Sequence, residues 1–168
     1  MIEIFTDGSC TGDKTGAWVA MVLLHGEKAI LKDLEPNTTH NRMELLAVIK
    51  AIEFTDEKYK DASLKIYTDS QYVHHIPERK EKLKKNQFLS EKGTPIQNGD
   101  LVKVLIDQID SHDINFVKIK AHQNSKLYSA GSPEAYNGEV DKLARKLVRG
   151  GFAGYTEGHR ESTDGHRD

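Results

Sequence analysis

The sequence has one cysteine, no long apolar run and almost no net charge. The single cysteine, Cys10, excludes an internal disulfide and a zinc site built from cysteines, and it favours a reducing compartment. The longest clear apolar run, Ala17 to Leu24, is far shorter than the roughly 18 residues that a membrane-spanning helix needs. Residues 1–7 lack the basic stretch and apolar core of a signal peptide. We therefore expect a cytoplasmic protein with no membrane role.

The composition is that of one globular domain. Apolar residues make up 37% and charged residues 30% of the 168 residues, which suits a single sizeable core. From residue 150 onward the chain has little apolar content and carries four acids and two arginines. We expect one monomeric domain over residues 1–149, followed by a polar, mobile tail over residues 150–168.

The balanced charge hides one basic segment. Residues 1–149 hold 22 acids and 22 bases, but the run Arg79–Lys85 has five bases and one acid. Such a run attracts polyanions, including nucleic acid. It is equally typical of a solvated helix face, so both interpretations stay open at this point.

Apolar periodicity predicts a sheet with helices packed on it. We expect strands over residues 2–6, 16–24, 28–34, 63–68 and 114–121. We expect helices over residues 42–55 with Asn41 as N-cap, over 70–76, from Pro77 through the basic run, over 100–109 and over 140–148. Residues 88–98 and 124–137 are expected to be loops. Three hairpin-like strands followed by alternating helices and strands indicate an α/β fold with a mixed sheet.

Two of these strands end in an aspartate. Asp7 lies in Thr6-Asp7-Gly8-Ser9, and Asp69 lies in Thr68-Asp69-Ser70. If the two strands are parallel neighbours, both carboxylates emerge at the sheet edge where α/β proteins place their ligands. Each aspartate alone is typical of a turn, so the repeated pattern favours a functional site without deciding it.

Two further acids begin predicted helices. Glu44 lies in the first turn of the helix over 42–55, and Asp141 opens the last helix. An acid in such a position interacts favourably with the helix dipole by about 0.3–1 kcal/mol. By spacing alone, this structural role is the favoured interpretation for both.

Taken together, the motifs resemble those of the type 1 ribonuclease H family. They run in the family's order: Thr6-Asp7-Gly8-Ser9, Asn41-Arg42-Met43-Glu44-Leu45, Thr68-Asp69-Ser70-Gln71-Tyr72-Val73, Lys120-Ala121-His122, and Val140 to Arg145 preceded by Asn137. The resemblance covers residues 2 to about 148. It implies a ribonuclease H-like fold, with a five-stranded mixed sheet of order 3-2-1-4-5, strand two antiparallel to the rest, and helices on both faces.

The resemblance also implies a catalytic metal site. Asp7, Glu44, Asp69 and Asp141 would converge, and their mutual repulsion would be relieved by two Mg²⁺ ions, with Mn²⁺ as a substitute. The implied reaction is two-metal hydrolysis of the RNA strand of an RNA–DNA hybrid, giving 3′-hydroxyl and 5′-phosphate ends. Two alternatives are another nuclease of this fold that acts on DNA, and a non-catalytic module that binds hybrids.

Other positions match family residues that assist the reaction or contact the substrate. His122 matches a mobile histidine that moves protons and helps product release, although a histidine that bonds the backbone at the start of a loop is the alternative. Implied substrate contacts are Asn41 and Gln71 in the minor groove, Thr39 and Arg42 near the backbone, Asn137, and the lysines Lys80, Lys82, Lys84 and Lys85 on phosphates.

The chain departs from the family pattern in four places. Asp13 lies in a short loop after the first strand, where its carboxylate would repel a phosphate. His40 stands where a second asparagine is common, which would weaken a groove contact or make it pH-dependent. The basic helix lacks tryptophan, since the only one is Trp18. His122 and Asp141 are 19 positions apart, which is longer than in familiar members.

Overall fold

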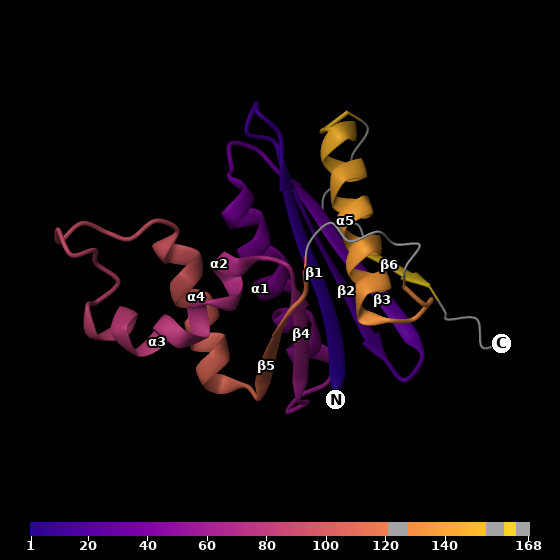
Figure 1. Ribbon diagram of the computed structural model, residues 1–168, viewed down its shortest axis with the longest axis horizontal. Helices are drawn as coiled ribbons and strands as arrows, with labels where there is room; N and C mark the ends of the chain where they lie inside the picture. Colours follow the sequence, from indigo (N-terminus) through magenta and orange to yellow (C-terminus); the bar gives the residue numbers. More distant parts are fainter. Residues whose placement is uncertain (121–127, 154–159, 164–168) are drawn as a thin grey trace.

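The computed structural model shows one mixed sheet with helices on both faces (Figure 1). It describes residues 1–120, 128–153 and 160–163. The strands are β1 (Ile2–Cys10), β2 (Gly16–Leu24), β3 (Glu27–Glu35), β4 (Leu64–Thr68), β5 (Ile114–Lys118) and β6 (Arg160–Thr163). The helices are α1 (His40–Lys58), α2 (Gln71–His74), α3 (Ile76–Lys85), α4 (Gly99–Ser111) and α5 (Pro133–Gly150).

The strand order is β5-β4-β1-β2-β3-β6. β1 pairs in parallel with β4, and β4 pairs in parallel with β5. β2 runs antiparallel to both of its neighbours, β1 and β3. The expected order 3-2-1-4-5, with strand two reversed, is therefore confirmed.

The sixth strand corrects the expectation of a wholly mobile tail. β6 pairs antiparallel with β3, with Arg160 opposite Leu31 and Thr163 opposite Lys28. An edge strand such as β3 offers unpaired backbone groups to any extended segment that reaches it. The expectation rests on the low apolar content of the tail, and composition does not report backbone pairing of this kind.

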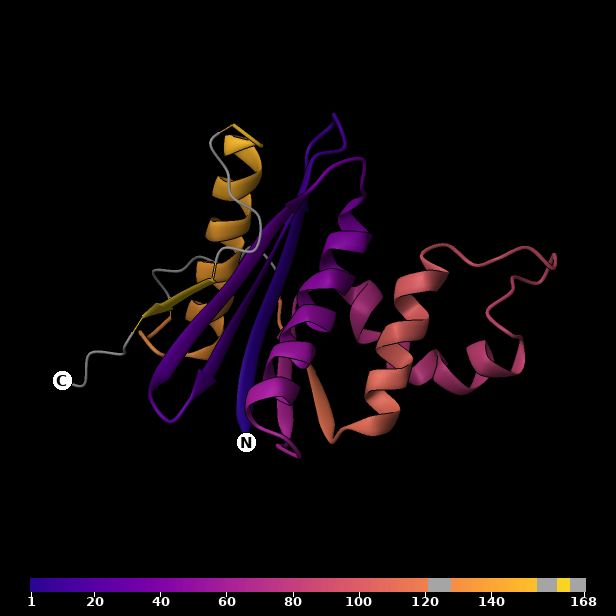
Figure 2. The ribbon, with the colours of Figure 1, turned by 180° about the vertical axis from the view of Figure 1, so that it is seen from behind.

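The two faces of the sheet carry separate cores. On one face, Ile4 and Ile66 pack against α1 and α4. On the other, Phe5 and Tyr67 stack with ring centroids 4.6 Å apart and pack against Val140 of α5. Figures 1 and 2 show α1 and α5 on opposite sides of the central strands. Because successive strand residues point to opposite faces, neighbouring positions on β1 and β4 supply both cores.

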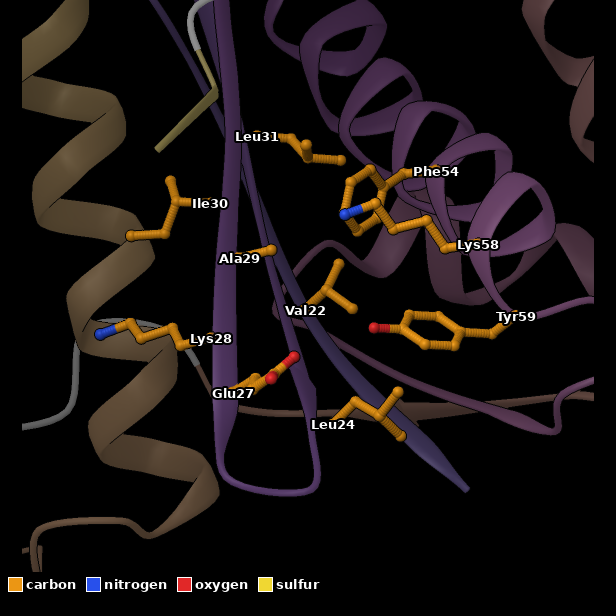
Figure 3. Close-up of a pocket in the computed structure, with 10 residues that line it drawn as sticks. All are labelled: Val22, Leu24, Glu27, Lys28, Ala29, Ile30, Leu31, Phe54, Lys58 and Tyr59. Carbon is orange, nitrogen blue, oxygen red and sulfur yellow. The ribbon is translucent and has the colours of Figure 1, made fainter. Parts of the chain in front are cut away.

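The same alternation appears on β3, where a cavity of about 140 Å³ separates the strand from the end of α1. Ala29 and Leu31 face this cavity and Phe54, whereas Lys28 and Ile30 point toward α5 (Figure 3). The ammonium of Lys28 pairs there with the carboxylate of Glu139 of α5.

No helix among the described residues is long and apolar enough to cross a membrane.

Helix α1 begins earlier than expected. Thr39, and not Asn41, is its N-cap, and the Thr39 hydroxyl accepts a hydrogen bond of 3.3 Å from the Arg42 amide. With the helix starting at His40, Glu44 lies beyond the first turn. The expected dipole role for Glu44 is therefore wrong, because that effect fades after the first turn.

Helix α5 begins seven residues earlier than the predicted helix over 140–148. Ser132 caps it by accepting a 3.2 Å hydrogen bond from the Ala135 amide, and Pro133 occupies the first turn. Gly131, Pro133 and Gly138 are typical of a loop, so this start falls within the expected loop. Asp141 consequently lies in the middle of the helix, so its expected dipole role is also wrong.

His112, the C-cap of α4, gives a testable pH dependence of stability. Burial alone would lower its pKa, but its hydrogen bonds to the Gln108 carbonyl (2.8 Å) and the Asp56 carboxylate (3.0 Å) raise that pKa above its ordinary value. A raised pKa stabilises the fold below the unfolded pKa of about 6.5, and this contribution is lost as the pH rises through the folded pKa. Between pH 5.5 and 8.5, the free energy of unfolding in urea should fall by about 0.5 kcal/mol more for the wild type than for His112→Asn. Parallel stability curves for the two proteins would contradict this role.

Candidate active site

Three carboxylates gather where the β1–β4 ladder ends. The last ladder pair joins Thr6 to Thr68, so the next residues, Asp7 and Asp69, emerge side by side. Glu44 reaches the same place from α1, and ligand oxygens of the three side chains all lie within 4.8 Å of one another. The structure thus brings Asp7 and Asp69 together, as expected, and adds the glutamate from the helix. The expected strand end before Asp7 is wrong, because β1 continues past Asp7 to Cys10, paired with β2.

A glycine allows α1 to come this close to the strand. A Cβ atom at Gly8 would lie 2.6 Å from the backbone nitrogen of Glu44 and 2.7 Å from the carbonyl carbon of Met43. Any larger residue would therefore push the helix backbone away from β1. The absence of a side chain at Gly8 lets α1 hold Glu44, which is only 1% exposed, directly beside Asp7.

Burial and like charge disfavour ionisation of this cluster. The pKa of Asp7 is raised, first by burial and then by the charges of Glu44, Asp69 and Asp141. Burial also raises the pKa of Glu44, with the Asp69 charge adding to it, although the Gly8 amide partly opposes the shift. Oε2 of Glu44 is buried without a hydrogen-bond partner in the described part of the chain. An oxygen-only set of this kind fits a hard divalent cation, which would satisfy the orphaned oxygen and keep the acids ionised.

The fourth acid, Asp141, borders the same space but is held by an arginine. Asp7, Glu44, Asp69 and Asp141 all line one cavity of about 420 Å³. Asp141 does not belong to the group of oxygens within 4.8 Å. Its Oδ2 accepts a 2.6 Å hydrogen bond from Arg145, one helical turn further on. All four acids therefore line the same cavity, but only three of them lie within 4.8 Å of one another, and Asp141 is paired with Arg145.

Two of the expected substrate contacts line this cavity. Asn41 and Gln71 both face it, together with His40, Ser70 and Tyr72. The last three were not among the expected substrate contacts. Adjacency to Gln71 was the only signal in the sequence for Ser70 and Tyr72, whereas His40 stands at a position where an asparagine is common in the family.

Two other expected contacts at the start of α1 already have partners. Thr39 is exposed but caps the helix. Arg42 donates two hydrogen bonds, of 2.9 and 3.0 Å, to the carboxylate of Asp100 on α4. This pairing lowers the pKa of Asp100 to about 2. Arg42 therefore joins α1 to α4, and its charge is shared with Asp100.

The remaining expected substrate contacts, Asn137 and the four lysines, differ in burial and in ion pairing. Asn137 is 6% exposed within α5 and does not line the cavity. Lys80 and Lys84 both pair with Asp110 of α4. Lys82 and Lys85 are exposed and form no ion pair with any residue that the structure describes.

Two expectations about loops have different outcomes. Asp13 accepts hydrogen bonds from the Thr11 hydroxyl and from the Thr15 amide (3.1 Å), so its carboxylate closes the turn after β1. The placement of His122 lies outside the described residues, and its role stays a prediction.

Comparison with known proteins assigns the family. A family model described as RNase H matches residues 1–149. The chain belongs to the RNase H family. It is therefore an enzyme, a ribonuclease, and this family is metal dependent.

Similar sequences and structures agree with this assignment. The chain is 35% identical over 152 residues to the ribonuclease H of Thermoanaerobacter sp. (strain X514), covering 89% of this chain and 90% of that protein. It is 37% identical over 150 residues to that of Bradyrhizobium sp. (strain ORS 278), covering 88% and 90%. The fold matches LC9-RNase H1, a type 1 RNase H, with a TM-score of 0.73 at 23% identity, over 89% of this chain and 72% of that one.

Substitution at Gly8 tests the close packing that builds the cluster. Gly8→Ala should destabilise the protein by about 1–3 kcal/mol, because the added methyl group meets backbone atoms of α1 that cannot turn aside. It should also lower nuclease activity, because Glu44 moves away from Asp7. The matched control is Gly12→Ala, since a Cβ at Gly12 has nothing within 4 Å. Equal stability of the two variants in urea unfolding would contradict this account.

Proposed function

We propose that the chain hydrolyses the RNA strand of RNA–DNA hybrids, using two Mg²⁺ ions held by Asp7, Glu44, Asp69 and Asp141. The main support for the metal site is the cluster of three carboxylates whose ligand oxygens lie within 4.8 Å of one another. One of them, Glu44, has a buried oxygen with no hydrogen-bond partner among the described residues. Mn²⁺ would substitute for Mg²⁺, and the products would carry 3′-hydroxyl and 5′-phosphate ends. The same fold in LC11-RNase H1, determined in complex with an RNA/DNA hybrid, supports this substrate (TM-score 0.61, 16% identity, 89% of this chain and 98% of that one).

The four acids would bind the cations, and His122 would transfer protons. When bound, a pair of divalent cations lowers the pKa of the attacking water and stabilises the leaving oxygen. Asp7, Glu44 and Asp69 hold the buried side of the site, each fixed by a different element of the fold. Asp141 closes the open side from α5. No side chain has to act as a nucleophile, and His122 would carry protons and assist product release.

Recognition of the hybrid would use the polar lining of the cavity and the basic helix. Asn41 and Gln71 have amide groups that can read 2′-hydroxyls and base edges in a minor groove. Thr39 lies at the exposed start of α1, beside them. Because Arg42 is bound to Asp100, we assign it mainly to holding α1 against α4. The burial of Asn137 does not suit a direct substrate contact.

We propose further that the protein acts as a monomer in the cytoplasm. The free, half-buried Cys10 is compatible with a reducing compartment. The neutral body of residues 1–149 would become positive when two cations bind, which favours a polyanionic substrate.

The direct test is to incubate the protein and Mg²⁺ with an RNA–DNA hybrid, double-stranded DNA and double-stranded RNA. Cleavage confined to the RNA strand of the hybrid is the expected result. Cleavage of DNA would favour the alternative of a DNA-directed nuclease of the same fold. Binding of the hybrid without any cleavage would favour a non-catalytic module.

Asp7→Asn separates catalysis from folding and binding. Loss of this ligand should reduce hybrid cleavage by more than the roughly 10–100-fold typical of outer-shell changes at metal sites, while hybrid binding survives. The pKa of Asp7, raised by burial and by the neighbouring acids to about 10, stabilises the metal-free fold at low pH, and this contribution is lost progressively as the pH rises from about 4 toward that pKa. Urea unfolding with a chelator present should therefore show Asp7→Asn gaining on the wild type between pH 5 and pH 8. A stability difference between the two proteins that stays constant from pH 5 to pH 8 would refute the repulsion on which the metal site depends.

The basic helix α3 allows a comparison of paired and unpaired lysines. Replacing Lys82 and Lys85 by Gln should weaken hybrid binding and reduce the slope of log affinity against log salt by up to about 2. Replacing Lys80 and Lys84 by Gln should change the slope less, because Asp110 already neutralises part of their charge. A larger slope change for the second pair in a salt titration would reverse this assignment.

Arg145→Gln tests whether the arginine competes with cations for Asp141. Removing an exposed pair of this kind should tighten Mg²⁺ binding about 2–5-fold, as measured by calorimetry. Arg149→Gln removes the same charge from the last turn of α5 and is the matched control. Equal Mg²⁺ affinities for the two variants would show that the Arg145 contact does not limit the site.

A further inference from the structure

We propose that His40 is an additional metal ligand, whose imidazole Nε2 shares one divalent cation with Glu44 and raises the affinity of this site for Mn²⁺ relative to Mg²⁺. This inference rests on the proposed function, since it concerns the same cation site. It goes further by adding a nitrogen donor to an otherwise all-oxygen set and by assigning a metal preference to one residue.

The spacing of the two side chains is that of neighbouring ligands on one ion. His40 is the first residue of α1 and Glu44 lies four residues later, so both project from the same face of the helix. The distance from His40 Nε2 to Glu44 Oε1 is 3.2 Å. Two adjacent ligands in an octahedral site with bonds of about 2.1 Å stand about 3 Å apart. A cation could therefore replace the direct contact with little movement of either side chain.

The surroundings of His40 leave its ring available to such an ion. His40 lines the same cavity as Asp7, Asp69 and Glu44, although its ring nitrogens, like the oxygens of Asp141, do not belong to the group of ligand atoms within 4.8 Å of one another. Its side chain is 62% exposed, whereas that of Glu44 is only 2% exposed. The buried Oε2 of Glu44 has no hydrogen-bond partner among the described residues, which points independently to a missing ligand. The buried carboxylate of Glu44 would therefore bind the cation from the interior, and the exposed imidazole of His40 would bind it from the solvent side.

The chemistry of the donor atoms sets the expected preference. Mg²⁺ takes oxygen ligands and keeps several of its waters, so it gains little from an imidazole. Mn²⁺ also favours oxygen ligands, but as a first-row transition ion it accepts an imidazole nitrogen more readily than Mg²⁺ does. Replacing an oxygen or water by the His40 nitrogen therefore stabilises bound Mn²⁺ more than bound Mg²⁺. The asparagine that is common at this position in the family has no such nitrogen donor.

Pulsed electron paramagnetic resonance of bound Mn²⁺ tests the ligand directly. An imidazole nitrogen bonded to Mn²⁺ produces a ¹⁴N coupling in the electron spin echo, which carboxylates do not. We expect this coupling in the wild type and its loss in His40→Asn, with Mn²⁺ still bound by the acids. His75→Asn is the matched control, because His75 forms a similar contact of 3.3 Å with Glu78 outside the cavity. The control should keep the coupling unchanged.

Calorimetric affinities give a second readout. His40→Asn should weaken Mn²⁺ binding by about tenfold or more, within the range seen when interactions at metal sites are removed, and change Mg²⁺ affinity by less than about threefold. An equal loss for both ions would overturn the proposed preference.

The outcomes separate this inference from the proposed function. Wild-type Mn²⁺ binding at the acids without a ¹⁴N coupling would overturn the role of His40 and leave the carboxylate site intact. A coupling that persists in His40→Asn would assign the nitrogen to another residue and would also overturn it. Failure of the wild type to bind Mn²⁺ or Mg²⁺ at all would instead remove the proposed metal site itself.

Discussion

The close contact between helix α1 and strand β1 at Gly8 is the constraint on which the site depends. It places the backbone of Glu44 against the strand, so that a buried carboxylate faces the carboxylate of Asp7. In the metal-free protein, burial and repulsion raise the pKa of both acids and oppose ionisation. The arrangement is stable only because packing elsewhere offsets it, and bound cations would convert the repulsion into coordination.

The rest of the fold supplies that packing and determines which acids can meet. Separate cores on the two faces of the sheet hold α1 and α5 firmly in place. Glu44 comes from the helix on one face and Asp141 from the helix on the other, while Asp7 and Asp69 come from the sheet between them. The four acids share a cavity where the β1–β4 ladder ends and β1 continues paired only with β2.

The sequence predicted the features that depend on local patterns. Short apolar runs bounded by turn residues located the five central strands, and the repeated Thr-Asp pattern after two of these runs predicted that Asp7 and Asp69 meet. Contacts between residues far apart in the chain could not be predicted from the sequence. Gly8 is typical of a turn, and nothing in the sequence shows that it faces Met43 and Glu44. The helix starts at His40 and Pro133 precede the predicted starts because the apolar periodicity that marks each helix begins only later in the sequence. The pairing of Lys80 and Lys84 with Asp110 was missed because the partner lies on another helix.

Diffraction from crystals soaked with Mn²⁺, recorded at a wavelength where manganese scatters anomalously, tests the central claim most directly. The account predicts an anomalous peak within about 2.5 Å of oxygens from Asp7, Glu44 and Asp69, and a second peak bordered by Asp141 at higher Mn²⁺ concentration. Strong peaks elsewhere on the protein, with none in this cavity, would contradict the claim that these acids are gathered to hold cations.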